Sequence, residues 1–449
     1  MSLRTRLASL PTSAKRLVFR SVRGALFRYV RAQPRPADQV GADRRVTIIL
    51  VSAWGMGGTI RTVLNLAGHL AQHYEVEIIS VFRRREASFF GSFPPGVKVT
   101  ALDDQRPEAL PRGLRGRLRT YMRGQSSVLM HPIDRAADQF NLWIDVQLAR
   151  RLHRGTGYLI TTRPGLNLLA AELSPPGYIK VGQEHMHLSN HARKLRQAMP
   201  KQYPKLDALA VLTEQDRIAY EALLRGSLPV AHIPNTVRAM GGPKADLSET
   251  TILAAGRVTP QKGFDLLLKA FAQVAPDHPD WRLRILGRGD WRVELERIVA
   301  ERGIGDSVIF DGPSEDLGGE MSRASIYALS SRFEGFPLVL IEAMSKGMAV
   351  VAFDCPTGPA DVIEDHRNGI LVPPKDVDAY AAGLREMMED EDLRRRCGEA
   401  AIETAKEYEM ARIGPSWDAL LERLRIGRGP EDPGAAQDNG AAALASRGA

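Results

Sequence analysis

The sequence has few cysteines and no long apolar run. Cys355 and Cys397 are its only cysteines, and neither lies in a spacing typical of a metal or redox site. So few thiols in 449 residues favour a reducing compartment. No apolar run approaches the roughly 18–20 residues that span a bilayer, and no apolar segment follows the N-terminal arginines as in a secretory signal. We therefore expect a cytoplasmic protein, at most peripheral on the inner face of the cell membrane.

The sequence also lacks a dinucleotide-binding fingerprint. Its first strand, residues 46–52, is followed by a glycine loop, but Gly55–Gly58 does not have the spacing G-x-G-x-x-G. No acid ends the second strand, where Phe82 and Arg83 follow. A nicotinamide site is therefore disfavoured.

The composition is that of a globular protein, with 44% hydrophobic and 25% charged residues. A chain of 449 residues exceeds one ordinary core, so we expect two domains plus tails. The formal net charge of +8 is modest for this length, and its distribution carries more information than its total.

Two segments concentrate the positive charge. Residues 1–45 carry eight or more basic side chains before the first acid, Asp38, and read either as an amphipathic helix on an anionic membrane surface or as a disordered leader. Residues 103–135 form a basic insertion, read either as a solvated loop with a short helix or as a surface for a polyanionic or membrane-bound acceptor. The membrane contact would involve 1–35 and 103–125. Neither segment has a nucleic-acid recognition motif, so nucleic acid is not an expected partner.

Strands and helices alternate over 46–238, which predicts a first parallel-sheet domain. Ligands bind at the carboxyl ends of such strands. Gly57 and Gly58 open the helix after the first strand, and we expect them to face a ligand. His185 and His187 follow the strand at 178–182, and His185 is favoured for substrate contact.

A second alternation over 251–406 predicts another parallel-sheet domain, after a linker at 239–250. Arg257 and Lys262 share one strand–helix loop, and two cations beside a helix N-terminus suit a diphosphate. A last helix is expected over 407–425 and a disordered tail over 426–449.

Residues 330–347 carry the most specific pattern. A buried strand leads into the turn Glu334-Gly335-Phe336, and a helix follows whose first turn is expected to hold Pro337. Free N–H groups at a helix N-terminus bind anions. The carboxylates of Glu334 and Glu342 suit sugar hydroxyls better than phosphate. The stretch therefore predicts a nucleotide-sugar site.

This ordered set of residues resembles the retaining glycosyltransferases of family 4. The likeness covers about 46–425 and is strongest over 251–373. It rests on Glu334 and Glu342 with seven residues between them, in the order Glu-Gly-Phe-Pro, Glu-Ala-Met and Lys-Gly. Arg257, Lys262-Gly263 and the run Asn-Gly-Ile-Leu-Val-Pro also fall in the family order. The resemblance implies an α/β protein of the GT-B fold, with two Rossmann-like domains facing across a cleft.

The resemblance also implies roles. Arg257 and Lys262 would hold the donor diphosphate, Glu342 the ribose, Glu334 the donor sugar, and His185 would lie near the sugar and acceptor. The expected catalytic residues are thus Glu334, His185, Arg257 and Lys262. Donor binding would involve Gly57, Gly58, Arg257, Lys262, Glu334, Gly335, Phe336, Pro337, Leu338, Val339 and Glu342, with backbone N–H groups of 336–339 contributing. Neither a cofactor nor a catalytic metal is expected, and the last helix would cross back onto the first domain.

The sequence indicates less clearly which subgroup of this family it resembles. Thr236-Val237-Arg238 stands where the family often has Gly, a hydrophobic residue and Asp, and Asp361 replaces a more usual Glu. The run 354–359 is similar to members that use UDP-hexoses or UDP-N-acetylhexosamines. Together with residues 183–185 it is also similar to enzymes that glycosylate polyol-phosphate (teichoic acid-like) polymers. We expect a cell-envelope glycan, lipid or polyol-phosphate acceptor.

Two alternatives stay open at this point. One keeps the fold and changes the reaction to that of a nucleotide-sugar epimerase or a sugar phosphorylase. The other, from a different class, is a non-catalytic protein that binds polyanions or membranes through its basic arm.

Overall fold

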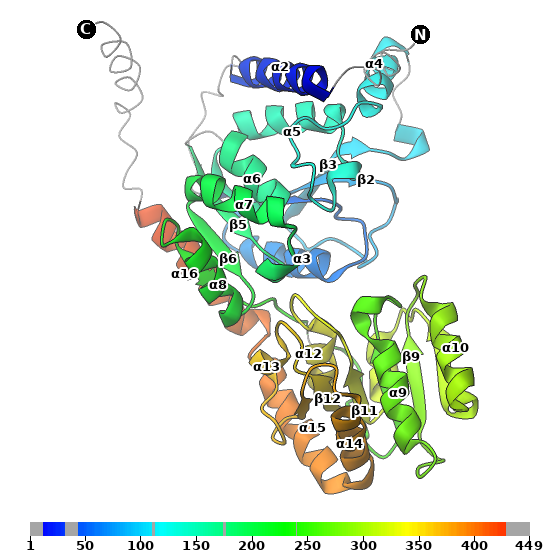
Figure 1. The fold of residues 1–449 in the computed structure, drawn as a ribbon. Coiled ribbons are helices and arrows are strands. Elements are labelled where there is room, and N and C mark those ends of the chain that lie inside the picture. Colours follow the sequence, from blue (N-terminus) through cyan, green and yellow to red (C-terminus); the bar gives the residue numbers. More distant parts are fainter. Residues whose placement is uncertain (1–11, 32–43, 110–112, 174–176, 239, 428–449) are drawn as a thin grey trace, which may run out of the picture.

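The computed structural model describes residues 12–31, 44–109, 113–173, 177–238 and 240–427. They form two α/β domains stacked end to end, with the first described helix and the last one both on the N-terminal domain (Figure 1). Residues 1–11 and 32–43 of the arm and residues 428–449 of the tail lie outside the described ranges. The expectation that the tail is disordered therefore concerns residues that the structure does not describe beyond Gly427.

The N-terminal domain contains a seven-stranded sheet in the order β3-β2-β1-β4-β5-β6-β7. All of its neighbouring strands pair in parallel. The strands are β1 (Arg45–Leu50), β2 (Glu75–Arg83), β3 (Val97–Asp104), β4 (Gly157–Thr161), β5 (Tyr178–Gln183), β6 (Ala208–Val211) and β7 (Val230–His232). The helices are α2 (Thr12–Arg31), α3 (Gly58–Leu70), α4 (Gly113–Arg123), α5 (Leu142–Arg154), α6 (Pro164–Leu173), α7 (Arg193–Gln202) and α8 (Glu214–Leu224).

The C-terminal domain contains a six-stranded parallel sheet in the order β10-β9-β8-β11-β12-β13. Its strands are β8 (Thr251–Ala255), β9 (Arg282–Leu286), β10 (Val308–Gly312), β11 (Ile326–Leu329), β12 (Ala349–Phe353) and β13 (Ile370–Val372). Its helices are α9 (Phe264–Val274), α10 (Arg292–Arg302), α11 (Leu317–Ser322), α12 (Leu338–Ser345), α13 (Pro359–Val362), α14 (Val377–Glu389) and α15 (Glu391–Lys406). The final helix is α16 (Met410–Gly427).

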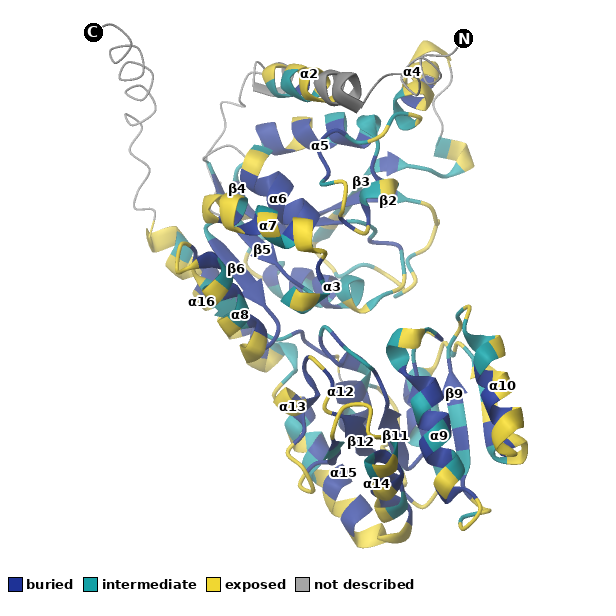
Figure 2. Ribbon diagram, viewed as in Figure 1, coloured by how far each residue is buried: buried dark blue, intermediate teal, exposed yellow. Residues whose placement is uncertain are grey.

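Both sheets are covered by helices, which explains the continuous apolar runs that mark their strands. Every residue of β4, β6, β11 and β12 is buried, and Figure 2 shows the sheets as the dark interior of each domain. The two domains have separate cores. One cluster includes Leu267, Phe271 and Ile285 of the C-terminal domain, whereas Ile144, Leu148 and Leu159 belong to the N-terminal domain.

Helix α16 returns to the N-terminal domain. Trp417, Leu420 and Leu421 are buried in the same cluster as Leu70 and Tyr158. The helix begins at Met410, three residues later than the predicted 407, and continues to Gly427, so its end includes two residues assigned to the tail.

The basic segments also differ from the expectation in detail. Asp103 and Asp104 belong to strand β3, so the insertion begins after the strand rather than at 103. Within the arm, residues 12–31 are helical, and Leu26 is buried in the N-terminal core. Among the described helices, none has both the length and the apolar character needed to cross a membrane.

Gly263 shows how closely the loops above the C-terminal sheet pack. It joins the short helical turn Pro260–Lys262 to α9 with a φ of 64°. A Cβ atom there would lie 2.0 Å from the carbonyl oxygen of Ser330, just after β11. Only glycine satisfies both the left-handed backbone and this approach.

We therefore expect Gly263→Ala to destabilise the protein by far more than Gly303→Ala. Gly303 has a similar φ of 68° but open space around it, so its replacement costs only the left-handed backbone, about 1–2 kcal/mol. At Gly263 the overlap with Ser330 adds roughly 1–3 kcal/mol. Urea unfolding of both variants measures the difference, and equal losses would contradict the packing described here.

Candidate functional site

The turn between β11 and α12 holds a buried carboxylate. Oε1 of Glu334 lies 2.7 Å from Nζ of Lys262 and accepts a 2.5 Å hydrogen bond from the hydroxyl of Ser331. The backbone N–H of Glu334 donates to the carbonyl of Pro356 at 2.8 Å. A buried charge persists when it is paired and hydrogen-bonded, so this acid is held in place rather than free to turn.

Further hydrogen bonds fasten the β8–α9 loop to the β11–α12 loop. The Gln261 side chain donates to the carbonyl of Phe333 at 3.1 Å, and the backbone N–H of Arg332 donates to the carbonyl of Gln261 at 2.8 Å. Arg332 also forms two 2.7 Å contacts with the carboxylate of Asp265 on α9. Lys262 is therefore positioned at Glu334 by both loops.

The other predicted cation lies differently. Arg257 is exposed at the start of the same loop, and its guanidinium approaches the Gln261 side chain at 3.5 Å. Arg257 is thus at the mouth of the site, whereas Lys262 is inside it. A long side chain in this position is free to reach a phosphate at the opening.

The N-terminus of α12 departs from the prediction in two ways. Pro337 is the residue before the helix rather than part of its first turn. The N–H of Leu338 donates to the carbonyl of Phe336 at 2.9 Å, and a proline has no N–H, so not all of 336–339 can donate to a ligand. The candidate donors that are left are Phe336 and Val339.

Glu342 faces the N-terminal domain. It is almost fully buried, and burial raises the pKa of its carboxyl while the charge of Arg61 opposes that rise. Nη1 of Arg61, on α3, binds Oε1 of Glu342 in an ion pair that joins the two domains. Arg61 was missed in the sequence, although it lies three residues after the Gly57-Gly58 pair.

The glycine loop and the Glu334 turn make two more close approaches between the domains. A Cβ atom on Gly335 would lie 2.2 Å from the carbonyl oxygen of His185, and one on Gly58 would lie 2.9 Å from the Leu338 side chain. These glycines let the backbones meet where the strand ends of both sheets face each other. Gly57 has a φ of 156°, and nothing lies near its Cβ position.

His185 presents a polar ring with no partner. Both ring nitrogens are buried and make no hydrogen bond, although part of the residue remains exposed. Loss of hydration lowers the pKa of the imidazole to about 4. The side chain is thus neutral at pH 7, with one donor and one acceptor available for a bound molecule.

A cavity of about 470 Å³ opens beside this ring at the strand ends of the N-terminal sheet. Its wall includes Thr59 and Ile60 in the first turn of α3, and two arginines, Arg135 and Arg163. Arg163 pairs with Asp134 at 2.5 Å. Arg135 is exposed, and among the described residues its polar contacts are a sulfur at 3.9 Å and a backbone carbonyl at 3.5 Å.

The neighbouring acids and histidines serve the fold. Glu184 is buried and accepts hydrogen bonds from Tyr203 and from Asn167, the latter at 2.9 Å. His187 caps a helical turn and lies 3.8 Å from Asp216. Its ring is therefore held by contacts within the domain, unlike the ring of His185. Within the described ranges, no three His, Cys, Asp or Glu side chains gather closely enough to hold a metal ion.

The C-terminal half of this site lies in a recognised domain. Residues 240–404 match the family model described as Glycosyl transferases group 1. The match covers the C-terminal domain and leaves the N-terminal domain outside it. The matched segment contains both acids, Glu334 and Glu342, and both predicted cations, Arg257 and Lys262.

Relatives extend the likeness to the N-terminal domain. The chain is 37% identical over 390 residues to an exopolysaccharide phosphotransferase of Streptomyces coelicolor, covering 85% of this chain and 41% of the relative. It is 26% identical over 379 residues to an α-1,4-N-acetyl-D-galactosaminyltransferase of Campylobacter jejuni that acts on a diphospho-undecaprenol-linked glycan, covering 84% and 98%. The chain thus spans less than half the length of the Streptomyces relative.

A solved structure shows the same fold. The TarM G117R mutant of S. aureus, in complex with fondaparinux, α-GlcNAc-glycerol and UDP, superposes with a TM-score of 0.66 at 15% identity. The match covers 84% of this chain and 99% of that one. The two parallel-sheet domains therefore have the GT-B fold, as expected.

The buried imidazole predicts a loss of stability in acid. The unfolded chain takes up a proton at His185 as the pH falls below about 6.5, whereas the folded site resists until about 4. The free energy of unfolding should fall by up to about 3 kcal/mol between these values. Urea unfolding at pH 7 and pH 5 should show a smaller loss for His185→Phe than for the wild type.

His366→Gln is a control that should change the loss of stability in acid in the opposite direction. The hydrogen bond that this exposed imidazole donates to Asp365 raises its pKa, so removal of the imidazole should make the loss of stability in acid slightly larger. An unchanged acid loss in His185→Phe would show that the ring is solvated in solution.

Proposed function

We propose that the protein is a retaining glycosyltransferase that moves a hexose or N-acetylhexosamine from a nucleotide sugar, with UDP as the favoured nucleotide. The observation that carries this proposal is the 2.7 Å contact between Lys262 and the buried carboxylate of Glu334. The next residue, Gly335, meets the backbone of the other domain, since a Cβ atom on it would lie 2.2 Å from the carbonyl oxygen of His185. The family match of residues 240–404 supports it, because the pair lies within that domain.

The donor would lie across the C-terminal sheet. Lys262, with Arg257 reaching in from the opening, supplies positive charge for the diphosphate, and the N–H groups of Phe336 and Val339 lie at the positive end of α12. Arg61 engages only Oε1 of Glu342, so Oε2 is the atom that we expect to accept from the ribose hydroxyls. Glu334 would accept from hydroxyls of the sugar.

The reaction would break the bond between the anomeric carbon and the β-phosphate oxygen. The bonding electrons go to the phosphate, whose new charge is stabilised by Lys262, Arg257 and the helix N-terminus. The acceptor hydroxyl forms its bond on the same face of the sugar, and its proton passes to the departing phosphate oxygen. The configuration at the anomeric carbon is then retained without a covalent intermediate on the protein.

His185 would orient the sugar rather than act as a base. Its pKa of about 4 makes it a poor proton acceptor at pH 7, whereas a neutral ring can both donate to and accept from a hydroxyl. A ligand hydroxyl would also provide the hydrogen-bond partner that the buried ring nitrogens lack.

The acceptor would enter the cavity of the N-terminal domain. Arg135 at its rim favours an acceptor that carries phosphate, which agrees with a lipid-linked or polyol-phosphate substrate. The relative from C. jejuni, named for a diphospho-undecaprenol acceptor, supports the lipid-linked alternative, and the structure with α-GlcNAc-glycerol supports the polyol one. Both belong to the cell envelope.

The central test is sugar transfer by single variants. Lys262→Ala should lower kcat at least about 10²-fold, because it removes a charge that stabilises the leaving group. Glu342→Ala should abolish nucleotide binding in calorimetry. Lys406→Ala and Glu422→Ala are the matched controls, since each removes only an exposed surface ion pair and should leave transfer unchanged.

Proton NMR of the product then reports the anomeric configuration. Full activity of both site variants would contradict the site assignment. An inverted product would contradict retention, and an epimerised sugar in the absence of an acceptor would favour the epimerase alternative.

A separate prediction concerns metal. Because Lys262, Arg257 and the α12 N-terminus supply the positive charge in this proposal, transfer should continue at an unchanged rate in EDTA. A fall in rate that added Mg²⁺ or Mn²⁺ restores would show that a metal ion carries part of this role.

A further inference from the structure

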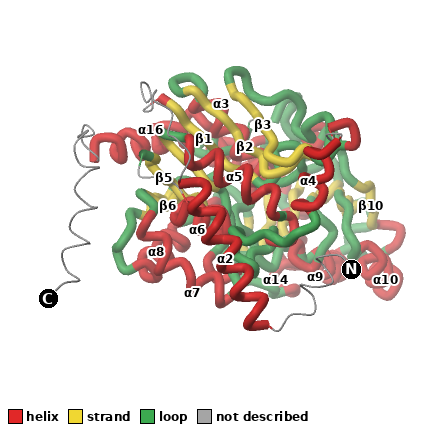
Figure 3. The backbone as a smooth tube through the Cα atoms, turned by 90° about the horizontal axis from the view of Figure 1, so that it is seen from above, coloured by secondary structure: helices red, strands yellow, loops and turns green. Residues whose placement is uncertain are grey.

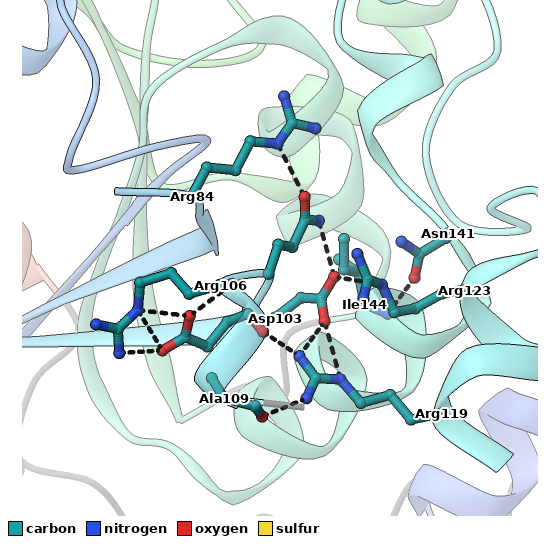
Figure 4. Close-up of polar contacts among 10 residues, drawn as sticks. Arg84, Asp103, Arg106, Ala109, Arg119, Arg123, Asn141 and Ile144 are labelled. Carbon is teal, nitrogen blue, oxygen red and sulfur yellow. Dashed lines mark hydrogen bonds and ion pairs between the residues drawn. The ribbon is translucent and has the colours of Figure 1, made fainter. Parts of the chain in front are cut away.

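Helix α4 is attached to the domain by its charged side. Arg119 is 7% exposed, and it donates to Asp103 Oδ1 through Nε at 3.2 Å and through Nη2 at 2.8 Å (Figure 4). Nη1 of Arg119 donates to the carbonyl of Ala109 at 3.1 Å, and Nε of Arg123 lies 3.2 Å from Oδ2 of Asp103. Asp103 is fully buried, so this pairing fixes the orientation of the helix.

The opposite side of α4 is apolar and faces outward. Leu114, Leu118 and Tyr121 have the spacing of one helical face, and they are 83%, 56% and 47% exposed. An amphipathic helix on a globular domain ordinarily turns its apolar stripe to the core. Here the buried residues of the helix are Gly116 and Arg119, and no segment among the described residues covers the apolar stripe.

Positive charge borders this stripe. Arg115 and Arg117 are exposed, α4 contains no acid, and within the described residues neither arginine has a carboxylate partner. Helix α2, which also contacts α5, adds the exposed Arg20 and Arg28 and likewise contains no acid. Figures 1 and 3 show α2 and α4 around α5 at the end of the molecule remote from the C-terminal domain.

The two basic helices are not equivalent. Leu26 of α2 is buried in the N-terminal core and Phe27 packs partly against it, so the protein itself takes up part of the apolar side of α2. The apolar side of α4 stays exposed. The larger exposed apolar surface is therefore on α4, because Phe19 and Val22 of α2 are only 37% and 36% exposed.

We propose that α4 docks on an anionic phospholipid bilayer, with Leu114, Leu118 and Tyr121 in the interface and Arg115 and Arg117 on lipid phosphates. Three apolar side chains alone give weak, reversible partitioning, and the flanking arginines add attraction to an anionic surface. Exposed leucines surrounded by arginine fit this surface better than they fit a soluble polyanion, which offers no apolar phase. The inference is independent of the reaction proposed above.

Vesicle co-sedimentation tests the docking surface. The full chain should bind vesicles of phosphatidylglycerol and phosphatidylcholine, and it should bind phosphatidylcholine alone far more weakly. Leu114→Ser/Leu118→Ser/Tyr121→Ser and Arg115→Ser/Arg117→Ser should each lower the partition coefficient roughly tenfold. Ile218→Ser/Val293→Ser and Arg302→Ser are the matched controls, because these side chains are exposed on other helices, and they should bind like the wild type.

A label reports insertion directly. Both native cysteines are buried, so Leu118→Cys can be labelled selectively with an environment-sensitive dye. Its emission should shift to the blue with anionic vesicles, whereas the same dye at Val293→Cys should not respond. Binding that is lost in the arginine variant but unchanged in the Leu/Tyr variant would overturn insertion in favour of charge alone.

Two further outcomes would contradict the proposal. A dimer in light scattering that the Leu/Tyr variant abolishes would assign the stripe to a second copy of this chain. Equal binding of wild type and both variants to anionic vesicles would assign the contact to another surface. Calorimetry with UDP-sugars on the same variants separates these results from the proposed reaction, because α4 lies away from the cleft and donor binding should be unchanged.

Discussion

The site depends on two strand ends being brought together: β8 lies beside β11 in the C-terminal sheet. The loop after β8 carries Lys262, and the loop after β11 carries Glu334. More than sixty residues of chain separate them, yet the sheet order places their side chains 2.7 Å apart. Gly263 makes this possible, because its missing Cβ is where the carbonyl of Ser330 lies. The strand order therefore brings the cation and the acid together, and the hydrogen bonds between the two loops fix the distance between them.

The same logic explains what could be read from the sequence. Apolar runs bounded by glycine turns mark parallel strands reliably when both faces of a sheet are covered, and the α/β architecture followed from them. Arg257, Lys262 and Glu334 lie in loops that follow strands. Glu342 lies within α12, and it was identified through the resemblance to a known motif. Their roles towards a donor are still predictions, because their geometry without a ligand shows proximity and charge only.

The details that sequence could not supply all involve contacts between distant segments. The pairing of Arg61 with Glu342 requires the relative placement of two domains, and an arginine in a helix reads by default as solvated. The orientation of α4 was hidden for the same reason. Its arginines are normal surface residues by pattern, and only the buried carboxylate of Asp103 shows that one of them faces inward. Pro337 is a local exception. Proline is most common at the first position of a helix, whereas here the helix begins one residue after it.

The path of α16 has a consequence for how the molecule can be divided. The chain leaves the N-terminal domain near Val237 and comes back near Glu409, where these two residues form a parallel bridge. The N–H of Val237 donates to the carbonyl of Tyr408 at 2.9 Å, so the outgoing and returning segments are joined side by side. The two domains are therefore joined by two adjacent connections. These connections mean that no single cut yields both domains whole: a fragment ending after residue 238 would leave bare the apolar surface that Trp417 and Leu421 cover.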